Sequence, residues 1–286
     1  MPHTTLISAA ELRGAIERGT PLVILDASFD LADTATGERA WREGHLPGAR
    51  YVHLDRDLAG PKTGANGRHP LPARETFAAR AGALGIVPAT QVVVYDRQQG
   101  IYAARAWWML RWLGHAAVAV LDGGVAAWQA EGGELETTAP SVTPAPPYPL
   151  AEPLVPSTEA GTLQSQLGIV RLIDARAPER FRGDVEPLDR QAGHIPGATN
   201  RFYKDNLRPD GRFKPAAQLR ADFERLGIAG NDATVVHQCG SGVTACHNLL
   251  AMEVAGLGTT TLYPGSWSEW SADPARPIAK GCGTCA

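Results

Sequence analysis

The chain has 286 residues, of which 44% are hydrophobic and 20% charged, and its 27 basic and 30 acidic residues leave a formal net charge of -3. These values are typical of a folded protein with room for two domains, and they argue against a disordered chain and against nucleic-acid binding. The first residues lack the cationic and apolar regions of a signal peptide, and no apolar stretch approaches the ~18 residues of a membrane span, so we expect a cytoplasmic protein without a membrane partner.

Short apolar runs alternate with helical stretches along the chain. The first helix is indicated by a capping box, in which Ser8 precedes Glu11 by three residues. The apolar runs, which predict buried strands, cover residues 22–25, 92–95 and 118–121, and helical stretches cover residues 74–85, 103–114 and 215–227. This alternation predicts α/β domains built around parallel sheets.

The same sequence plan occurs twice. "VILDAS", which ends at Ser28, matches "RLIDAR", which ends at Arg176, and "GHLPGA" (44–49) matches "GHIPGA" (193–198). Order is kept while spacing varies slightly, as a tandem duplication predicts. A proline-rich stretch separates the copies. We therefore predict an N-terminal domain, a linker, a second domain and a flexible tail, at residues 1–139, 140–156, 157–280 and 281–286.

Cys239 lies between a predicted strand (234–236) and a predicted helix, and a glycine-containing loop follows it directly. Such a loop aims backbone N–H groups at an anion, and a helix N-terminus favours a thiolate there, so the context predicts a nucleophile rather than a buried structural cysteine. The aligned position in the first copy is Asp96, so we expect that domain to be inactive. The spacing of Cys282 and Cys285 suggests a dithiol on the tail, which could take sulfur from Cys239.

These motifs resemble the two-domain rhodanese superfamily, and within it the sulfurtransferases that use 3-mercaptopyruvate. The resemblance rests on "CGSGVTA" (239–245), the two "GH(L/I)PGA" turns and "LYPGSWSEW" (262–270), and it spans nearly the whole chain. It implies an α/β fold of two tandem rhodanese-like domains, each a parallel sheet flanked by helices. The C-terminal domain would be the catalytic one.

The resemblance also implies a reaction. Cys239 would accept sulfur from 3-mercaptopyruvate as a persulfide, release pyruvate, and pass the sulfur to cyanide or to a thiol such as thioredoxin or a small thiol, with no cofactor and no metal. A proton relay in the family maps onto Ser241, His69 and Asp55. The last two come from the first copy of the repeat.

Substrate binding is likewise assigned by resemblance. The cysteine loop would hold negative charge through the backbone of Gly240, Gly242, Val243 and Thr244. Arg180 of "ERFRG" would bind the donor carboxylate, because a guanidinium pairs bidentately with it. Arg190 would be the second arginine, although its segment is shorter than the family pattern. Arg182 is expected to be solvated.

Other interpretations remain open. Thiosulfate sulfurtransferase activity would use the same cysteine, but relatives that prefer thiosulfate typically carry basic residues at the positions of Gly240 and Ser241. A cysteine phosphatase would need arginine where Ala245 stands. A noncatalytic persulfide carrier is a third possibility. For the remaining candidates, we expect Asp174 and Arg176 to hold the active loop, His237 to line the site or serve the core, Trp267 to lie near the loop, and Trp107, Trp108 and Trp112 to be core or interface residues.

Overall fold

The computed structural model describes residues 2–230 and 234–282, which divide into two compact units. The first unit contains the chain up to Gly60, Pro72–Leu154 and the short segment Asp210–Arg212. The second contains Pro61–Leu71, Val155–Pro209 and the chain from Phe213 onward. Within the described residues, no helix is long and apolar enough to cross a membrane.

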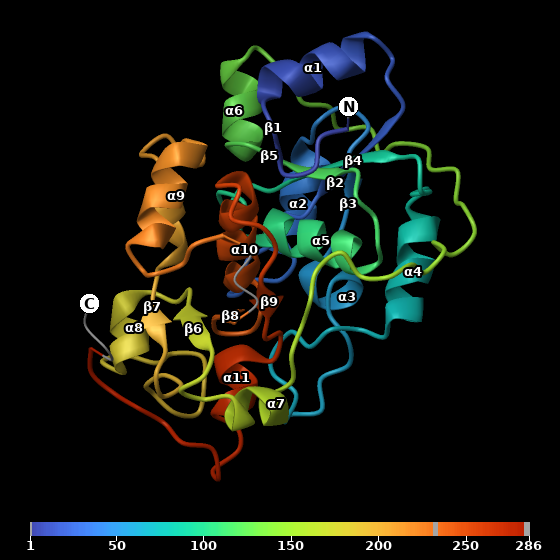
Figure 1. Ribbon diagram of the computed structural model, residues 1–286. Coiled ribbons are helices and arrows are strands. Elements are labelled where there is room, and N and C mark those ends of the chain that lie inside the picture. The colour runs from blue at the N-terminus through green and yellow to red at the C-terminus, as the bar shows by residue number, and fades with distance from the viewer. Residues whose placement is uncertain (1, 231–233, 283–286) are drawn as a thin grey trace. The chain divides into compact units, whose positions relative to one another are not determined.

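A five-stranded parallel sheet forms the centre of the first unit (Figure 1). In spatial order its strands are β1 (Leu6–Ile7), β5 (Val118–Leu121), β4 (Gln91–Tyr95), β2 (Leu22–Asp26) and β3 (Arg50–Tyr51). The three longest match the apolar runs of the sequence, because strands with both faces covered by helices read as continuous apolar stretches. This confirms the predicted parallel α/β architecture.

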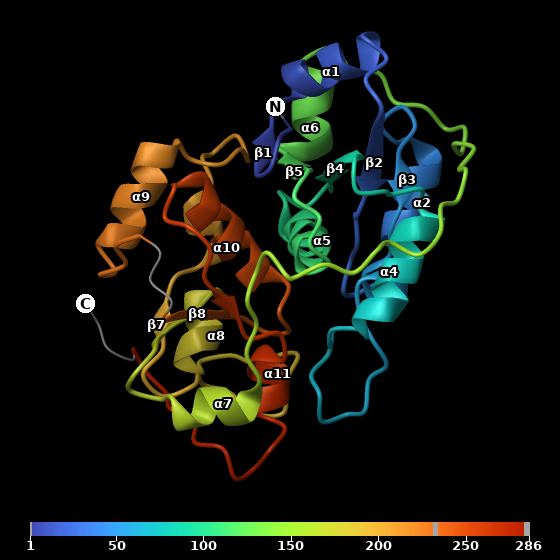
Figure 2. The same ribbon diagram turned by 45° about the vertical axis from the view of Figure 1, so that its right-hand side comes forward.

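Helices cover both faces of this sheet. They are α1 (Ala9–Glu17), α2 (Thr36–Glu43), α3 (Leu54–Asp57), α4 (Arg74–Ala83), α5 (Ile101–Trp112) and α6 (Gly124–Ala130). The predicted capping box begins α1, where Ser8 accepts a hydrogen bond from the Glu11 N–H. In Figures 1 and 2, α1 and α6 lie side by side, and they bury Leu12 and Trp128 against the Val93 face of the sheet.

The second unit repeats this plan around a four-stranded parallel sheet. Its strands are β7 (Thr199–Asn200), β6 (Arg171–Asp174), β8 (Val235–Gln238) and β9 (Thr261–Leu262), in that spatial order. A single parallel bridge between Ser157 and Leu262 stands where the first unit has the pairing of β1 with β5. The duplicated sequence therefore gives a duplicated sheet order.

Helices again flank the second sheet. They are α7 (Ala160–Ser165), α8 (Pro178–Arg182), α9 (Ala216–Glu224), α10 (Thr244–Val254) and α11 (Ser266–Trp270), with one 3₁₀ turn, η1 (Tyr203–Asn206). Helices α7 and α11 lie together in both views (Figures 1 and 2), where Leu163, Trp267 and Trp270 join Leu172 and Val236 in one apolar core. The carboxyl ends of β6 and β8 thus lead into the loops that hold the candidate site.

The units differ from the expected division at three places, one of which is Asp210–Arg212, expected in the second domain but grouped with the first unit. Residues 61–71, expected in the N-terminal domain, belong to the second unit, and the Arg68 N–H donates to Ser268 Oγ at 3.0 Å. The proline-rich stretch contains no helix or strand, but its residues up to Leu154 belong to the first unit, where the Tyr148 N–H donates to the Ala78 carbonyl at 2.9 Å. Composition alone does not reveal such packing.

Candidate active site

Cys239 follows β8 directly, and its loop leads into the N-terminus of α10. The side chain is nearly inaccessible, with 1% of the residue exposed. The loop turns at Gly242, whose φ is 73°, and a β-carbon there would lie 2.4 Å from the Pro264 carbonyl oxygen. Only glycine fits this position, because the left-handed backbone and the close approach of the neighbouring loop both exclude a side chain.

A second loop, between β9 and α11, fixes the backbone around the cysteine. The Cys239 N–H donates to Ser266 Oγ at 3.0 Å, and the Trp267 N–H donates to the Cys239 carbonyl at 3.0 Å. Ser266 Oγ also lies 4.0 Å from Cys239 Sγ. Trp267 therefore lies near the loop, as expected, and Cys239 is held in place by contacts from outside its own loop.

Ser266 is a site residue that sequence reasoning missed. It has a φ of 53°, a strained conformation for a residue with a side chain, and strain of this kind clusters at functional sites. In the first unit the matching position of the repeat is Gly124, which adopts the same conformation with a φ of 56°. The sequence signal that could have indicated Ser266 is that a serine stands where the other copy of the repeat has a glycine.

His69 and Ser241 meet in the second unit. His69 Nδ1 lies 2.8 Å from Ser241 Oγ, a hydrogen-bonding distance, and the two residues are only 4% and 6% exposed. The contact exists because the segment 61–71 packs with the second unit rather than with the domain that its sequence position suggests. Asp55 lies on α3 of the first unit, so its part in a relay stays a prediction.

Two arginines stand over Gly240, next to the cysteine. A β-carbon on Gly240 would lie 2.8 Å from Nη2 of Arg68 and 3.4 Å from Nη1 of Arg180. Arg180, a predicted substrate-binding residue, is therefore at the loop. Arg68 was not predicted, although it adjoins His69 in "GRHPLP". Arg190, the other predicted arginine, has an exposed side chain.

Both guanidinium groups are paired with acidic side chains. Arg180 Nη2 lies 2.7 Å from Glu186 Oε1 and 3.2 Å from Asp189 Oδ2. Arg68 Nη1 forms an ion pair with the other oxygen of the Asp189 carboxylate, Oδ1. Arginines from other segments therefore provide positive charge beside the Cys239 loop, and acids balance it.

A buried ion pair between Arg176 and Asp174 lies next to these arginines. Arg176 Nη2 lies 2.6 Å from Asp174 Oδ2 and donates to the Gly193 carbonyl at 2.8 Å. Its guanidinium also lies over the Trp267 ring, 4.7 Å from the centroid. These contacts join β6, the "GHIPGA" turn and the loop that clamps Cys239, which agrees with a structural role for Asp174 and Arg176. Arg182 pairs with Asp184 near the surface.

The corresponding loop of the first unit shows what this backbone can bind. The Asp96 carboxylate accepts four backbone hydrogen bonds of 2.8–2.9 Å, from the N–H groups of Gln98, Gly100, Tyr102 and Ala103. Gln99 has a φ of 63° at the repeat position of Gly242. The loop of the first unit is thus a cradle for one anion, filled by its own aspartate. This supports the idea that the matching loop stabilises negative charge at Cys239.

Other candidates prove to be structural. His237 is fully buried on β8, with Nε2 3.1 Å from Met252 Sδ, and burial lowers the pKa of its imidazole to about 3. Trp107 and Trp108 are completely buried, as expected of core residues. Cys282 is exposed, whereas Cys285 lies outside the described residues, so the proposed dithiol stays a hypothesis. Among residues 2–230 and 234–282, no cluster of three metal-ligating side chains is found.

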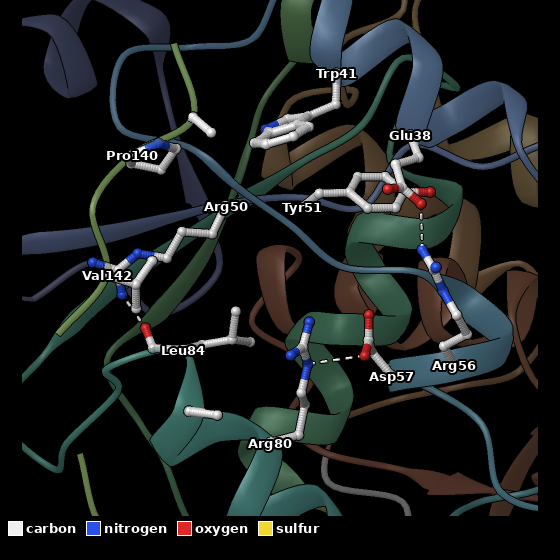
Figure 3. A pocket seen from close by; sticks show the side chains of 12 residues that line it. Glu38, Trp41, Arg50, Tyr51, Arg56, Asp57, Arg80, Leu84, Pro140 and Val142 are labelled. Carbon is white, nitrogen blue, oxygen red and sulfur yellow. Dashed lines mark hydrogen bonds and ion pairs between the residues drawn. The ribbon is translucent and has the colours of Figure 1, made fainter. Parts of the chain in front are cut away.

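A cavity of about 510 Å³ lies in the first unit, and none of the predicted site residues lines it (Figure 3). Four of its charged side chains form two ion pairs, Arg56 with Glu38 at 2.5 Å and Arg80 with Asp57 at 2.8 Å, and a third arginine, Arg50, donates to the Leu84 carbonyl. The residues that line the cavity all belong to the first unit, whereas Cys239 belongs to the second.

Comparison with known proteins agrees with the geometry. The rhodanese-like domain family matches residues 8–131 and 158–273. A Pseudomonas aeruginosa protein named probable 3-mercaptopyruvate sulfurtransferase is 46% identical over 98% of this chain and all of its own length. A Mycobacterium tuberculosis protein named as a thiosulfate sulfurtransferase is 43% identical over 96% of this chain and 97% of its own.

A solved structure gives the same result for the fold. The crystal structure of a 3-mercaptopyruvate sulfotransferase from Escherichia coli superposes with a TM-score of 0.79 at 31% identity, covering 93% of this chain and all of that one. The family model matches both copies of the repeat, and the two sheets share one strand order, which indicates that the two domains arose from one ancestral domain. The chain belongs to the rhodanese family and carries two rhodanese-like domains.

Proposed function

We propose that this chain is a sulfurtransferase that takes sulfur from 3-mercaptopyruvate onto Cys239, releases pyruvate, and passes the sulfur to a thiol or to cyanide. The observation that carries the proposal is the buried contact of 2.8 Å between His69 and Ser241, in the loop that begins at Cys239. A thiol donor brings a proton that must be moved, and a hydroxyl paired with an imidazole provides a path for it.

The reaction balances with these groups alone. The Cys239 thiolate attacks the donor sulfur, the S–S bond forms as the C–S bond breaks, and the bonding electrons leave with the enolate of pyruvate. Ser241 and His69 carry the donor's thiol proton to the enolate carbon, which gives pyruvate and a persulfide anion on Cys239. Backbone N–H groups of the loop would stabilise that anion, as the matching loop of the first unit does for Asp96.

The second half-reaction regenerates the enzyme. An acceptor thiolate, from thioredoxin or a small thiol, attacks the outer sulfur of the persulfide and leaves as a new persulfide, while the Cys239 thiolate is restored. Cyanide would accept the same sulfur as thiocyanate. In neither case is an external oxidant or reductant consumed in forming the transferred S–S or C–S bond.

Thiosulfate is the rival donor, and a relative at 43% identity bears a name of that kind. Thiosulfate leaves as sulfite with its charge at the reacting end, so its use favours unpaired cations beside the cysteine. Gly240 and Ser241, the two residues that follow Cys239, supply no cation. Their lack of charge favours 3-mercaptopyruvate, whose carboxylate is remote from its sulfur.

The test compares kcat/KM for the two donors, each with cyanide and with a dithiol acceptor. We expect the higher value with 3-mercaptopyruvate, and mass spectrometry should find one extra sulfur on Cys239 after donor alone. Cys239→Ser should abolish both, whereas Cys246→Ala, with a buried thiol on α10, should retain both. A higher kcat/KM with thiosulfate would overturn the donor assignment. Persulfide formation without turnover would instead identify a carrier.

A further inference from the structure

We propose that Arg68 and Arg180 together bind the donor carboxylate, and that Asp189 occupies this arginine pair when no donor is bound. Donor binding would then exchange one carboxylate for another at the same two guanidinium groups. The inference rests on the proposed function, because it assumes a donor with a carboxylate. It makes Arg68 the second arginine that binds the donor carboxylate, a role that the family resemblance assigned to Arg190.

The Asp189 carboxylate bridges the two arginines in the way that we propose for the donor carboxylate. Its Oδ1 pairs with Arg68 and its Oδ2 lies 3.2 Å from Arg180 Nη2, so each oxygen faces a different arginine. The Asp189 side chain is 4% exposed, whereas those of Arg68 and Arg180 are 25% and 17% exposed. The arginines thus remain partly open to solvent while the acid is enclosed between them.

The pair is also at the right place. Both guanidinium groups lie against Gly240, which follows the nucleophile, and a β-carbon at Gly240 would come within 2.8 Å of Arg68. A carboxylate bound there would put the donor beside the Cys239 loop. Arg190 is exposed and adjoins Asp189, so the segment directs its acid, rather than its arginine, towards the pair.

Charge balance explains why the donor carboxylate would replace Asp189 rather than bind in addition to it. The connected cluster contains three arginines and three acids: Arg68, Arg176 and Arg180 with Asp174, Glu186 and Asp189. A further carboxylate would be an uncompensated charge in a largely buried site, which is costly. If Asp189 leaves, the donor takes its place and the balance is restored.

Asp189 is the acid best placed to leave. Burial raises the pKa of its carboxyl group, so its ionised form is poorly solvated where it stands. It lies in a segment without helix or strand, next to the exposed side chains of Leu188 and Arg190. Glu186, by contrast, is tied to both Arg176 and Arg180 and also accepts the Leu188 and Asp189 N–H groups. Glu186 can therefore stay while Asp189 moves into water.

The decisive variants are Asp189→Asn, which keeps the shape but removes the competing charge, and Arg68→Gln. We expect Asp189→Asn to lower the KM for 3-mercaptopyruvate and the Kd for pyruvate by about 3- to 10-fold with kcat retained. Arg68→Gln should raise both constants by about 10-fold, the scale of one lost charge-assisted hydrogen bond. In the Arg68→Gln background, Asp189→Asn should have little further effect.

Two controls separate this mechanism from general electrostatics. Arg182→Gln removes a nearby cation whose partner is Asp184, and it should change neither constant. Mercaptoacetone, which has a methyl group where 3-mercaptopyruvate has its carboxylate, should show no gain with Asp189→Asn. Circular dichroism and urea unfolding of each variant would show that the fold is kept, and Arg68→Lys offers a second variant that retains the charge but not the planar fork.

The outcomes are distinguishable. Unchanged KM and Kd in Asp189→Asn would overturn the exchange, as would a loss of binding in Arg190→Gln but not in Arg68→Gln. If the wild type does not turn over 3-mercaptopyruvate, the proposed function fails. Calorimetric titration with pyruvate still tests the exchange in that case, and no binding of pyruvate to the wild type would overturn it.

Discussion

Acid should destabilise the second unit through His237, which is fully buried on β8 two residues before Cys239. Burial lowers the pKa of this imidazole from 6.5 to about 3. Above pH 6.5 the folded and unfolded chains both carry the neutral form, so the full stability is present. As the pH falls from 6.5 towards 3, only the unfolded chain takes up the proton, and stability is progressively lost.

The size of the effect follows from the pKa shift. Each pH unit below 6.5 costs about 1.4 kcal/mol, so moving from pH 8 to pH 5 should cost about 2 kcal/mol at this one residue. His237→Leu removes the titrating group and places an apolar side chain of similar size next to Met252. The variant should therefore lose about 2 kcal/mol less than the wild type over the same pH change.

The assay is urea unfolding followed by tryptophan fluorescence, at pH 8 and at pH 5, for both proteins. Burial also lowers the pKa values of His53, His115 and His194, but these groups titrate alike in both proteins and cancel in the comparison. Equal losses of stability in wild type and variant would refute the reasoning, because His237 would then be protonated in the folded protein or solvated there.

Three further substitutions have defined expected outcomes. Asp96→Ala leaves four backbone N–H groups of the first unit without their acceptor, so urea unfolding should show a loss of roughly 3–5 kcal/mol, while sulfur transfer per folded molecule falls far less than in Cys239→Ser. Ser266→Ala should lower kcat/KM by roughly tenfold, because the Cys239 N–H loses its acceptor. Ser266→Gly should be the more stable of the two variants, since it relieves the positive φ, but no more active. Gly242→Ala should inactivate the enzyme and lower its melting temperature, because the new methyl group meets the Pro264 carbonyl. A fully active variant would contradict the fit described for that loop.

The sequence was sufficient to predict the long strands and to propose a nucleophile. Apolar runs identify β2, β4 and β5 because strands buried on both faces carry little polar signal, and the glycine loop after β8 makes Cys239 a candidate by local context alone. The two-residue strands β1, β3, β7 and β9 were not predicted, since a run that short carries no periodicity.

Contacts between distant segments were the part that the sequence could not provide. Arg68 and Asp189 are far apart in the chain, and no local pattern indicates that they pair. Arg190 was proposed because a family pattern has an arginine near that position; its side chain is exposed, while that of the adjacent Asp189 is buried against Arg180, and its part in substrate binding stays a prediction. Ser266 was overlooked for a similar reason: its importance depends on where β9 and α11 place it, not on its neighbours in the sequence.

The membership of residues 61–71 in the second unit has a consequence for how this chain can be divided. A fragment beginning after the proline-rich stretch would contain Cys239 but lack His69 and Arg68, leaving Ser241 and Asp189 buried without those partners. Nor does any single cut separate the two units, because the chain passes between them more than once. Although the repeat indicates that the two halves began as copies, the copy that contains Cys239 packs with a segment encoded in the other. Activity lost on cleavage should return only when both fragments are present together.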